Sequence, residues 1–121
     1  MYLGIDIGTQ SLKVVVTDEQ LRVLGTGTCA HEVVYPEPGW AEQDPYDWER
    51  GLAPAISAAL AEAEVAADDI RAVGVSGQLD GCVPVSSHGD AVGPCLLWMD
   101  RRASEHMPVL PAEFHARTGV I

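Results

Sequence analysis

The sequence predicts an α/β domain with a mixed sheet, in which antiparallel strands come first and a helix then leads to a parallel strand. Three observations support this fold class. Two short apolar runs flank a tight connection at Gly8–Ser11, which is typical of a β-hairpin. Apolar residues recur at helical spacing after Pro45, and a strand predicted at 71–76 enters a glycine-rich loop. The 121 residues, 47% of them hydrophobic, suit one domain or part of one.

Three strands are expected before the helix. The first ends near Asp6, and residues 11–18 and 21–34 form the second and third strands, with a turn around Asp18–Gln20. Side chains alternate between the two faces of a strand, so the first strand places its aliphatic side chains on one face and Asp6 on the other. The proline-rich segment 36–39 then breaks the pattern and forms a loop.

A helix is expected to begin at Pro45. Asp44 can cap its N-terminus, proline is favoured at the first helical position, and Asp47 suits the positive end of the helix dipole. The buried stripe of this helix is formed by apolar residues at helical spacing, namely Trp48, Leu52, Ala55, Ile56, Ala59, Leu60 and Ala63.

Further strands are expected after the helix. The strand that follows it, with Val73 and Val75 inside, enters the loop Gly77–Gly81 at its carboxyl end. Open α/β sheets bind ligands at that end of their strands, so this loop is a candidate binding segment. Two more strands, joined by a turn, are expected at residues 82–86 and 94–98.

Composition argues against several classes of partner. The net charge is −11 with only seven basic residues, a balance that repels nucleic acid and anionic membranes. No long apolar run or leader pattern occurs, so neither a transmembrane nor a secretory segment is expected. The cysteines Cys29, Cys82 and Cys95 are odd in number and widely spaced, which indicates buried thiols in a reducing cytoplasm. The four histidines are too scattered to indicate a metal site.

The first hairpin carries the strongest chemical signal. Asp6 lies near the end of the first strand, and glycines share its face, as at a place where a ligand approaches the backbone closely. Exposed amide groups in such a turn can hold an anion, and a carboxylate beside it can hold hydrated Mg²⁺. An ordinary hairpin with a solvated aspartate is the alternative.

The stretch Met1–Thr17 resembles the phosphate-binding motif of the actin/hexokinase ATPase superfamily, in which hydrophobic-Gly-hydrophobic-Asp is followed by x-Gly-Thr. Three more segments resemble the FGGY carbohydrate kinases of that superfamily in the same order: Gly39–Pro45, Gly74–Gly81 and Leu96–Arg102. Within that family the xylulokinases are the most similar group. Four ordered matches are far more specific than a single motif.

The resemblance implies a ribonuclease-H-like α/β fold and the use of ATP and Mg²⁺. It implies that Asp6 binds Mg²⁺ through water, and that the turn meets the phosphates through Gly8, Thr9, Gln10 and Ser11. Lys13 matches a basic position of the motif and would add a positive charge there, with a solvated strand lysine as the alternative. The family's general-base aspartate and its adenine pocket are expected beyond residue 121.

The resemblance also implies a sugar-binding set made of Gln78, Leu79, Asp80, Trp98 and Asp100. The family holds sugar hydroxyls with the two residues after the glutamine, which are Met-His in typical xylulokinases and Arg-Glu in glycerol kinases. Here these positions are Leu79 and Asp80, which match neither pattern. A carboxylate accepts hydroxyl hydrogen bonds, whereas leucine packs only against carbon. The alternatives are an ordinary Asp-Gly turn and a core tryptophan at a strand end.

The sequence therefore predicts the N-terminal part of a kinase that phosphorylates a ketopentose such as xylulose, or a similar polyol, with ATP. A non-catalytic binding or assembly fragment of the actin-like superfamily, or a related phosphatase, is the alternative. Residues 1–121 are expected to form part of an N-terminal domain and to be inactive alone. A sheet cut short would leave an uncovered edge, which favours association, including a homodimer.

Overall fold

The structure, a computed structural model, describes residues 1–109. Its main sheet has the order β3-β2-β1-β5, with β1 at Tyr2–Ile7, β2 at Ser11–Thr17, β3 at Val23–Ala30 and β5 at Ala72–Gly77. The first three strands are antiparallel, and β5 runs parallel to β1. The predicted mixed sheet, with three antiparallel strands before the helix and a parallel strand after it, is confirmed.

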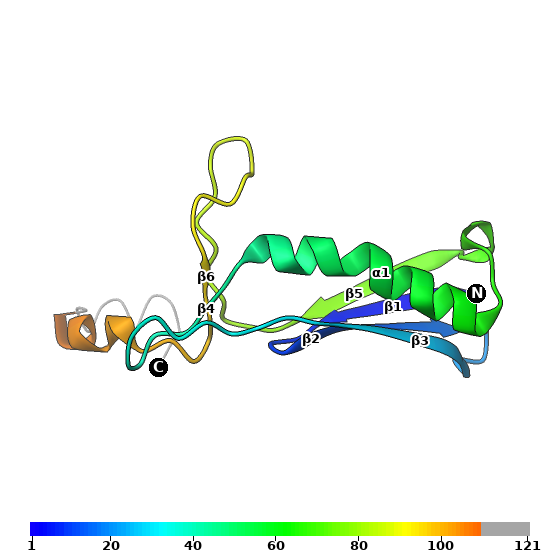
Figure 1. Cartoon of the computed structure of the whole chain (residues 1–121), viewed down its shortest axis with the longest axis horizontal. Helices are drawn as coiled ribbons and strands as arrows, with labels where there is room; N and C mark the ends of the chain where they lie inside the picture. The colour runs from blue at the N-terminus through cyan, green and yellow to red at the C-terminus, as the bar shows by residue number, and fades with distance from the viewer. Residues whose placement is uncertain (110–121) are drawn as a thin grey trace.

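The helix α1, at Pro45–Ala63, lies along one face of this sheet (Figure 1). As predicted, the Asp44 carboxylate accepts a hydrogen bond from the Tyr46 N–H at 3.0 Å, and Pro45 occupies the first turn. A short 3₁₀ helix, η1 at Ala67–Asp69, then leads into β5.

Two glycines of β3 allow α1 to approach the sheet closely. A Cβ added at Gly27 would overlap the Ala55 carbonyl oxygen, and one added at Gly25 would overlap the Ala59 carbonyl oxygen. Ala55 and Ala59 are themselves 1% and 0% exposed. The helix therefore rests backbone to backbone on β3, an arrangement that side chains larger than hydrogen at these strand positions would prevent.

The core lies between α1 and the sheet. Alternate residues of β1 and β2 face the helix, as the period of a strand requires. The buried members are Leu3, Ile5, Leu12, Val14, Val16, Ala55 and Ala59. The remaining predicted residues of the helical stripe are partly buried, and most pack against this cluster.

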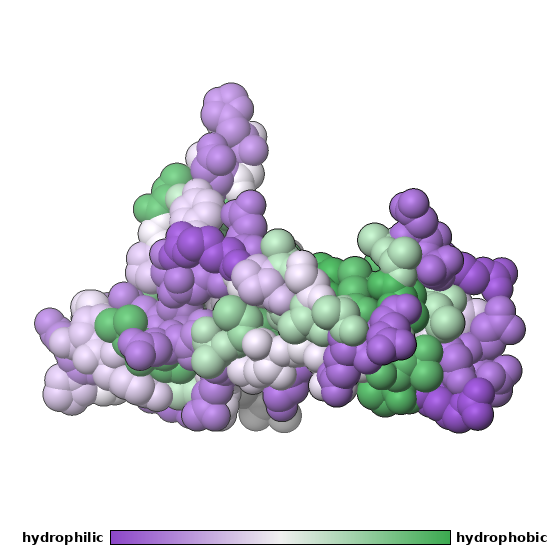
Figure 2. Space-filling view, turned by 45° about the vertical axis from the view of Figure 1, so that its right-hand side comes forward, coloured by the Kyte–Doolittle hydropathy of each residue, from purple (hydrophilic) through white to green (hydrophobic). Residues whose placement is uncertain are grey.

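The prediction that Val73 and Val75 lie inside is wrong. They are 57% and 69% exposed, although they pair with Leu3 and Ile5 and so share the face that carries α1. The physical reason is that α1 packs on β2 and β3 and leaves β5 uncovered. Figure 2 accordingly shows apolar surface over the body formed by the sheet and the helix.

The segment after β5 also differs from the prediction. Residues 82–86 form no strand but only isolated bridges, of Cys82 with Leu96 and of Val85 with Ala91. The predicted strand at 94–98 is reduced to β6 at Cys95–Leu96, which pairs with β4 at Glu42–Gln43. The residues between these two segments project from the body as a narrow, mainly polar extension (Figures 1 and 2), beside which no other strand lies within residues 1–109.

Two smaller predictions also need correction. The third strand ends at Ala30 rather than at residue 34, because its partner strand β2 begins at Ser11, which pairs with Ala30, and Val34 instead forms a bridge with Glu42. The cysteines carry free thiols, but only Cys95 is buried, whereas Cys82 is exposed. Burial raises the pKa of the Cys95 thiol, which favours its neutral form.

Candidate functional site

Two loops meet at the carboxyl ends of β1 and β5. Ile7, the last residue of β1, pairs with Gly77, the last residue of β5, and the Gln78 N–H donates to the Ile7 carbonyl oxygen at 2.8 Å. The register therefore brings the turn that follows β1 next to the loop that follows β5. The two segments that sequence analysis singled out are neighbours in space.

Two adjoining cavities open at this place. The larger has a volume of about 450 Å³ and is lined by Asp6, Gly8, Thr9, Gly77, Gln78, Leu79, Asp80 and Trp98. The smaller has a volume of about 330 Å³ and is lined by Asp6, Gly8, Thr9, Gln10, Ser11, Lys13, Trp98 and Met99. Every predicted site residue except Asp100 lines one or both of them.

The carbonyl oxygens of the turn after β1 accept hydrogen bonds from His31 and Gln43, which fix the turn in place. His31 Nε2 donates to the Gly8 oxygen at 2.7 Å, and the His31 N–H donates to the Gln10 oxygen at 3.1 Å. Gln43 Nε2 donates to the Thr9 oxygen at 2.6 Å. In a planar trans peptide, each N–H points away from the carbonyl that precedes it. The N–H groups of Thr9 and Gln10 are therefore directed away from these anchors, and neither meets an acceptor among residues 1–109.

Asp6 and Lys13 stand beside this turn. They are paired across the β1–β2 ladder and both are exposed, so a carboxylate and an ammonium group share the mouth of the smaller cavity. Mg²⁺ prefers oxygen ligands and keeps several waters, and anions bind at concave sets of amide groups. An exposed carboxylate next to unengaged amides therefore fits a hydrated Mg²⁺ with phosphate oxygens.

The loop after β5 presents different chemistry. Leu79 is 78% exposed, and Asp80 adopts a left-handed conformation with φ 58°. Aspartate tolerates this region better than most residues, and such outliers are common at ligand sites. Trp98 is 50% exposed at the wall of the same cavity, and its Nε1 donates to Thr9 Oγ1 at 3.2 Å. The cavity thus combines a carboxylate, an aliphatic side chain and an aromatic ring.

A known protein family matches nearly the whole chain. A sequence model described as the FGGY family of carbohydrate kinases, N-terminal domain, matches residues 1–119. The chain belongs to this family. The resemblance inferred from four ordered segments is confirmed.

Individual relatives are similar over most of this FGGY domain. It is 33% identical to a xylulose kinase of Escherichia coli (strain K12) in an alignment of 112 residues, which covers 93% of this chain and 23% of that protein. It is 38% identical over 116 residues to a glycerol kinase of Verminephrobacter eiseniae (strain EF01-2), which covers 94% of this chain and 22% of that protein.

A solved structure described as a xyloylose kinase from Brucella ovis superposes with a TM-score of 0.88 at 35% identity, over 99% of this chain and 26% of that one. The predicted fold class is confirmed by this similarity. The chain spans about a quarter of the length of the proteins that it matches.

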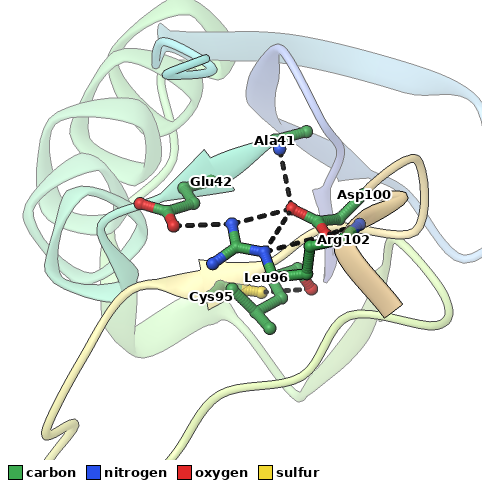
Figure 3. A network of polar contacts seen from close by, with 6 residues as sticks. All are labelled: Ala41, Glu42, Cys95, Leu96, Asp100 and Arg102. Atoms are coloured by element: carbon green, nitrogen blue, oxygen red, sulfur yellow. Dashed lines mark hydrogen bonds and ion pairs between the residues drawn. The ribbon is translucent and has the colours of Figure 1, made fainter. Parts of the chain in front are cut away.

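Asp100, the one predicted site residue outside both cavities, belongs to a clamp in the FGGY domain (Figure 3). Its side chain is 6% exposed, and its oxygens accept hydrogen bonds from the Ala41 N–H at 2.8 Å and from the Arg102 guanidinium at 2.8–3.0 Å. Arg102 also pairs with Glu42 at 2.6 Å. These contacts fasten the segment that carries Trp98 to β4, and they engage both carboxylate oxygens of Asp100.

Trp40 completes this clamp. The Arg102 guanidinium lies 3.8 Å from the centre of its ring, a cation–π contact. Trp40, in the FGGY segment Gly39–Pro45, is thereby joined to the segment that carries Trp98.

The clamp makes stability depend on pH. The Arg102 guanidinium, aided by the Ala41 and Arg102 N–H groups, holds the pKa of Asp100 well below its ordinary value of 3.8. A carboxyl group whose pKa is lower in the folded state stabilises the protein above that ordinary value, and the stabilisation is lost as the pH falls below it. We expect Asp100→Asn to lower the urea midpoint at about pH 7. The difference from the wild type should shrink at about pH 3, and a difference that is the same at both would contradict this account.

Two residues that hold the site were missed by sequence analysis. Gln43 and His31 anchor the turn after β1, but the groups of the turn that they bind are backbone carbonyl groups, which no side-chain pattern reveals. Gln43 does belong to the Gly39–Pro45 segment that carried the FGGY resemblance, and this was the available signal.

Within the described part of the chain, no group of three or more histidine, cysteine, aspartate or glutamate side chains is arranged to hold a metal ion. His115 lies outside the described residues. None of the helices described here has the length and apolar character needed to cross a membrane.

Proposed function

We propose that this FGGY domain forms the phosphate- and sugar-binding wall of a kinase that transfers a phosphoryl group from ATP to a sugar hydroxyl. The observation that carries the proposal is the cavity of about 450 Å³. It is lined by the turn after β1, by the loop after β5 with Asp80, and by Trp98 from the segment after β6. Phosphoryl transfer requires mainly that donor and acceptor are positioned together and that charge is stabilised. A single cavity with both kinds of lining meets that requirement.

On the phosphate side, the Thr9 and Gln10 N–H groups would donate to phosphate oxygens. Gly8 and Ser11 would line the same place and close the turn, because the Gly8 N–H donates to the Ser11 carbonyl oxygen at 3.1 Å. Lys13 would add the positive charge that the acidic chain otherwise lacks at this place. Asp6 would hold Mg²⁺ through its water shell, and the ion would neutralise charge that develops on the transferred phosphoryl group.

On the sugar side, Asp80 would accept hydrogen bonds from hydroxyl groups, while Trp98 and Leu79 would pack against carbon atoms. Gln78 is occupied by Thr9 and Gln43, so it would act by shaping the loop. The substrate class we propose is a ketopentose such as xylulose or a similar polyol. Relatives described as xylulose kinase and glycerol kinase are about equally similar, and Leu79-Asp80 matches neither expected pair.

Transfer itself would need groups outside residues 1–121. The resemblance to FGGY kinases implies a general-base aspartate and an adenine pocket beyond the two cavities at the turn. We propose that the general base and the adenine site lie in further sequence of the kind its longer relatives possess. Residues 1–121 alone would then show no sugar-dependent ATP turnover.

The test is a coupled assay of ADP formation by the protein that carries this domain in its full length, with xylulose, glycerol or no acceptor. We expect ADP only when an acceptor is present. Asp80→Ala should raise the KM for the sugar about tenfold or more, because a carboxylate acceptor is lost, and should leave the KM for ATP unchanged.

Asp80→Asn is the control for the left-handed backbone, since asparagine tolerates this conformation as aspartate does. Release of phosphate in the absence of any sugar acceptor would favour the alternative that the protein is a phosphatase. The absence of any turnover would favour the alternative that it has a binding or assembly role. An unchanged sugar KM in both variants would remove Asp80 from the site.

A further inference from the structure

One buried amide connects the two loops of the site. Gln43 is 1% exposed, and each of its hydrogen-bonding positions is filled. Its Nε2 donates to the Thr9 oxygen at 2.6 Å and to the Glu32 oxygen at 3.2 Å. Its Oε1 accepts from Gln78 Nε2 at 3.0 Å and from Trp48 Nε1 at 3.3 Å. Gln43 therefore contacts both the turn after β1, residues 8–11, which we call the phosphate turn, and the loop after β5, residues 77–81, which we call the sugar loop.

The partners leave Gln43 only one orientation. Two of them are backbone carbonyl oxygens, which only accept, and the Trp48 indole only donates. If the amide were flipped, Nε2 would face the indole N–H and Oε1 would face the carbonyl oxygens. All three of these hydrogen bonds would be lost in a buried place, where unpaired polar groups are costly.

This orientation determines the next two links. Because Gln43 Oε1 can only accept, Gln78 must turn its Nε2 toward it, and its Oε1 then accepts from the Thr9 hydroxyl at 3.0 Å. The Thr9 hydroxyl has used its hydrogen, so its oxygen accepts from Trp98 Nε1 at 3.2 Å. The directions of all bonds from Gln43 to the exposed Trp98 ring follow from one another.

We propose that Gln43 is a positioning residue that couples the phosphate turn to the sugar loop by holding Thr9, Gln78 and Trp98 in one hydrogen-bond orientation. This inference rests on the proposed function for the meaning of the two loops, but the chain of bonds exists without it. Gln43 does not line the cavity of about 450 Å³, so its effect on a ligand there would pass through Thr9 and Gln78. A merely structural glutamine would stabilise the fold without influencing Trp98.

The first experiment follows the Trp98 indole N–H by NMR in the intact protein, with ¹⁵N-labelled tryptophan and with Trp98→Phe to assign the resonance. Gln43→Met keeps the side-chain length and removes all four hydrogen bonds. We expect the Trp98 indole resonance to shift and its hydrogen exchange to accelerate about tenfold or more, although Gln43 does not contact Trp98.

Val16→Ala is the matched control, because Val16 is 0% exposed in the core and takes no part in this chain of bonds. It should lower stability and leave the Trp98 resonance in place. Gln43→Leu is the second variant: it also removes all four hydrogen bonds, including the acceptor for Gln78 Nε2, with an apolar side chain of similar volume, so it should show the same shift. An unchanged Trp98 resonance in a folded Gln43 variant would overturn the proposal.

The second experiment measures kcat/KM for the sugar and for ATP in the same variants. Gln43→Met should lower kcat/KM for the sugar about tenfold or more, whereas Val16→Ala should stay near the wild type. A sugar kcat/KM within about twofold of the wild type in Gln43→Met would contradict the coupling. If the wild type transfers no phosphoryl group at all, the proposed function fails, while the NMR result still decides the role of Gln43.

Discussion

Asp6→Asn is expected to lower phosphoryl transfer on the order of a hundredfold in the protein that carries this domain in its full length. The change removes a negative charge at the place where we propose that Mg²⁺ is held through water, and it preserves the size of the side chain. Asp6 is exposed at the end of β1, so the fold should not depend on it. The measurement is the rate of ADP formation with saturating sugar and varied Mg²⁺.

Asp90→Asn provides the matched control for this change. Asp90 is also exposed, and it lies in the extension that projects from the body rather than at either cavity. The same loss of one charge there should leave the rate unchanged. Equal rates for the wild type and Asp6→Asn at every Mg²⁺ concentration would exclude Asp6 from the phosphate site.

Gly27→Val is expected to lower the free energy of unfolding by about 2–3 kcal/mol, an amount that can unfold a marginally stable domain. A Cβ at this position would overlap the Ala55 carbonyl oxygen, so α1 would have to move away from β3. Because the obstacle is helix backbone rather than a flexible side chain, little relaxation is available. Urea denaturation followed by circular dichroism measures the change.

The same substitution in another strand separates packing from strand propensity. A Cβ added at Gly74 in β5 meets no atom within 4 Å, so Gly74→Val should be neutral or slightly stabilising, as valine favours strands. Equal destabilisation by both variants would show that the close approach of α1 to β3 is not the cause.

Sequence analysis predicted the features that are set by neighbouring residues. The hairpin around Gly8–Ser11, the Asp44 cap and the strand that enters the Gly77–Gly81 loop all follow from local patterns and were confirmed. The Gly77–Gly81 loop was identified because it follows the carboxyl end of a strand, and the turn after β1 because glycines share the face of Asp6. Their adjacency follows from the parallel register of β1 and β5.

Features that depend on distant partners were not predictable in this way. Val73 and Val75 have the pattern of buried residues, but where α1 lies on the sheet decides whether they are covered. Asp100 was expected at the sugar because its segment resembles a binding motif, whereas its oxygens are used by Ala41 and Arg102. The role of Gln43 depends on carbonyl groups that no side-chain pattern displays.

The most direct test of the central claim is a crystal structure of the full-length protein with MgADP and the proposed sugar substrate, xylulose. The account predicts that phosphate oxygens accept from the Thr9 and Gln10 N–H groups. It also predicts that the sugar lies in the same cavity, with a hydroxyl on Asp80 and carbon atoms on the Trp98 ring. A nucleotide phosphate that makes no contact with the turn after β1, or a sugar bound away from Asp80 and Trp98, would contradict it.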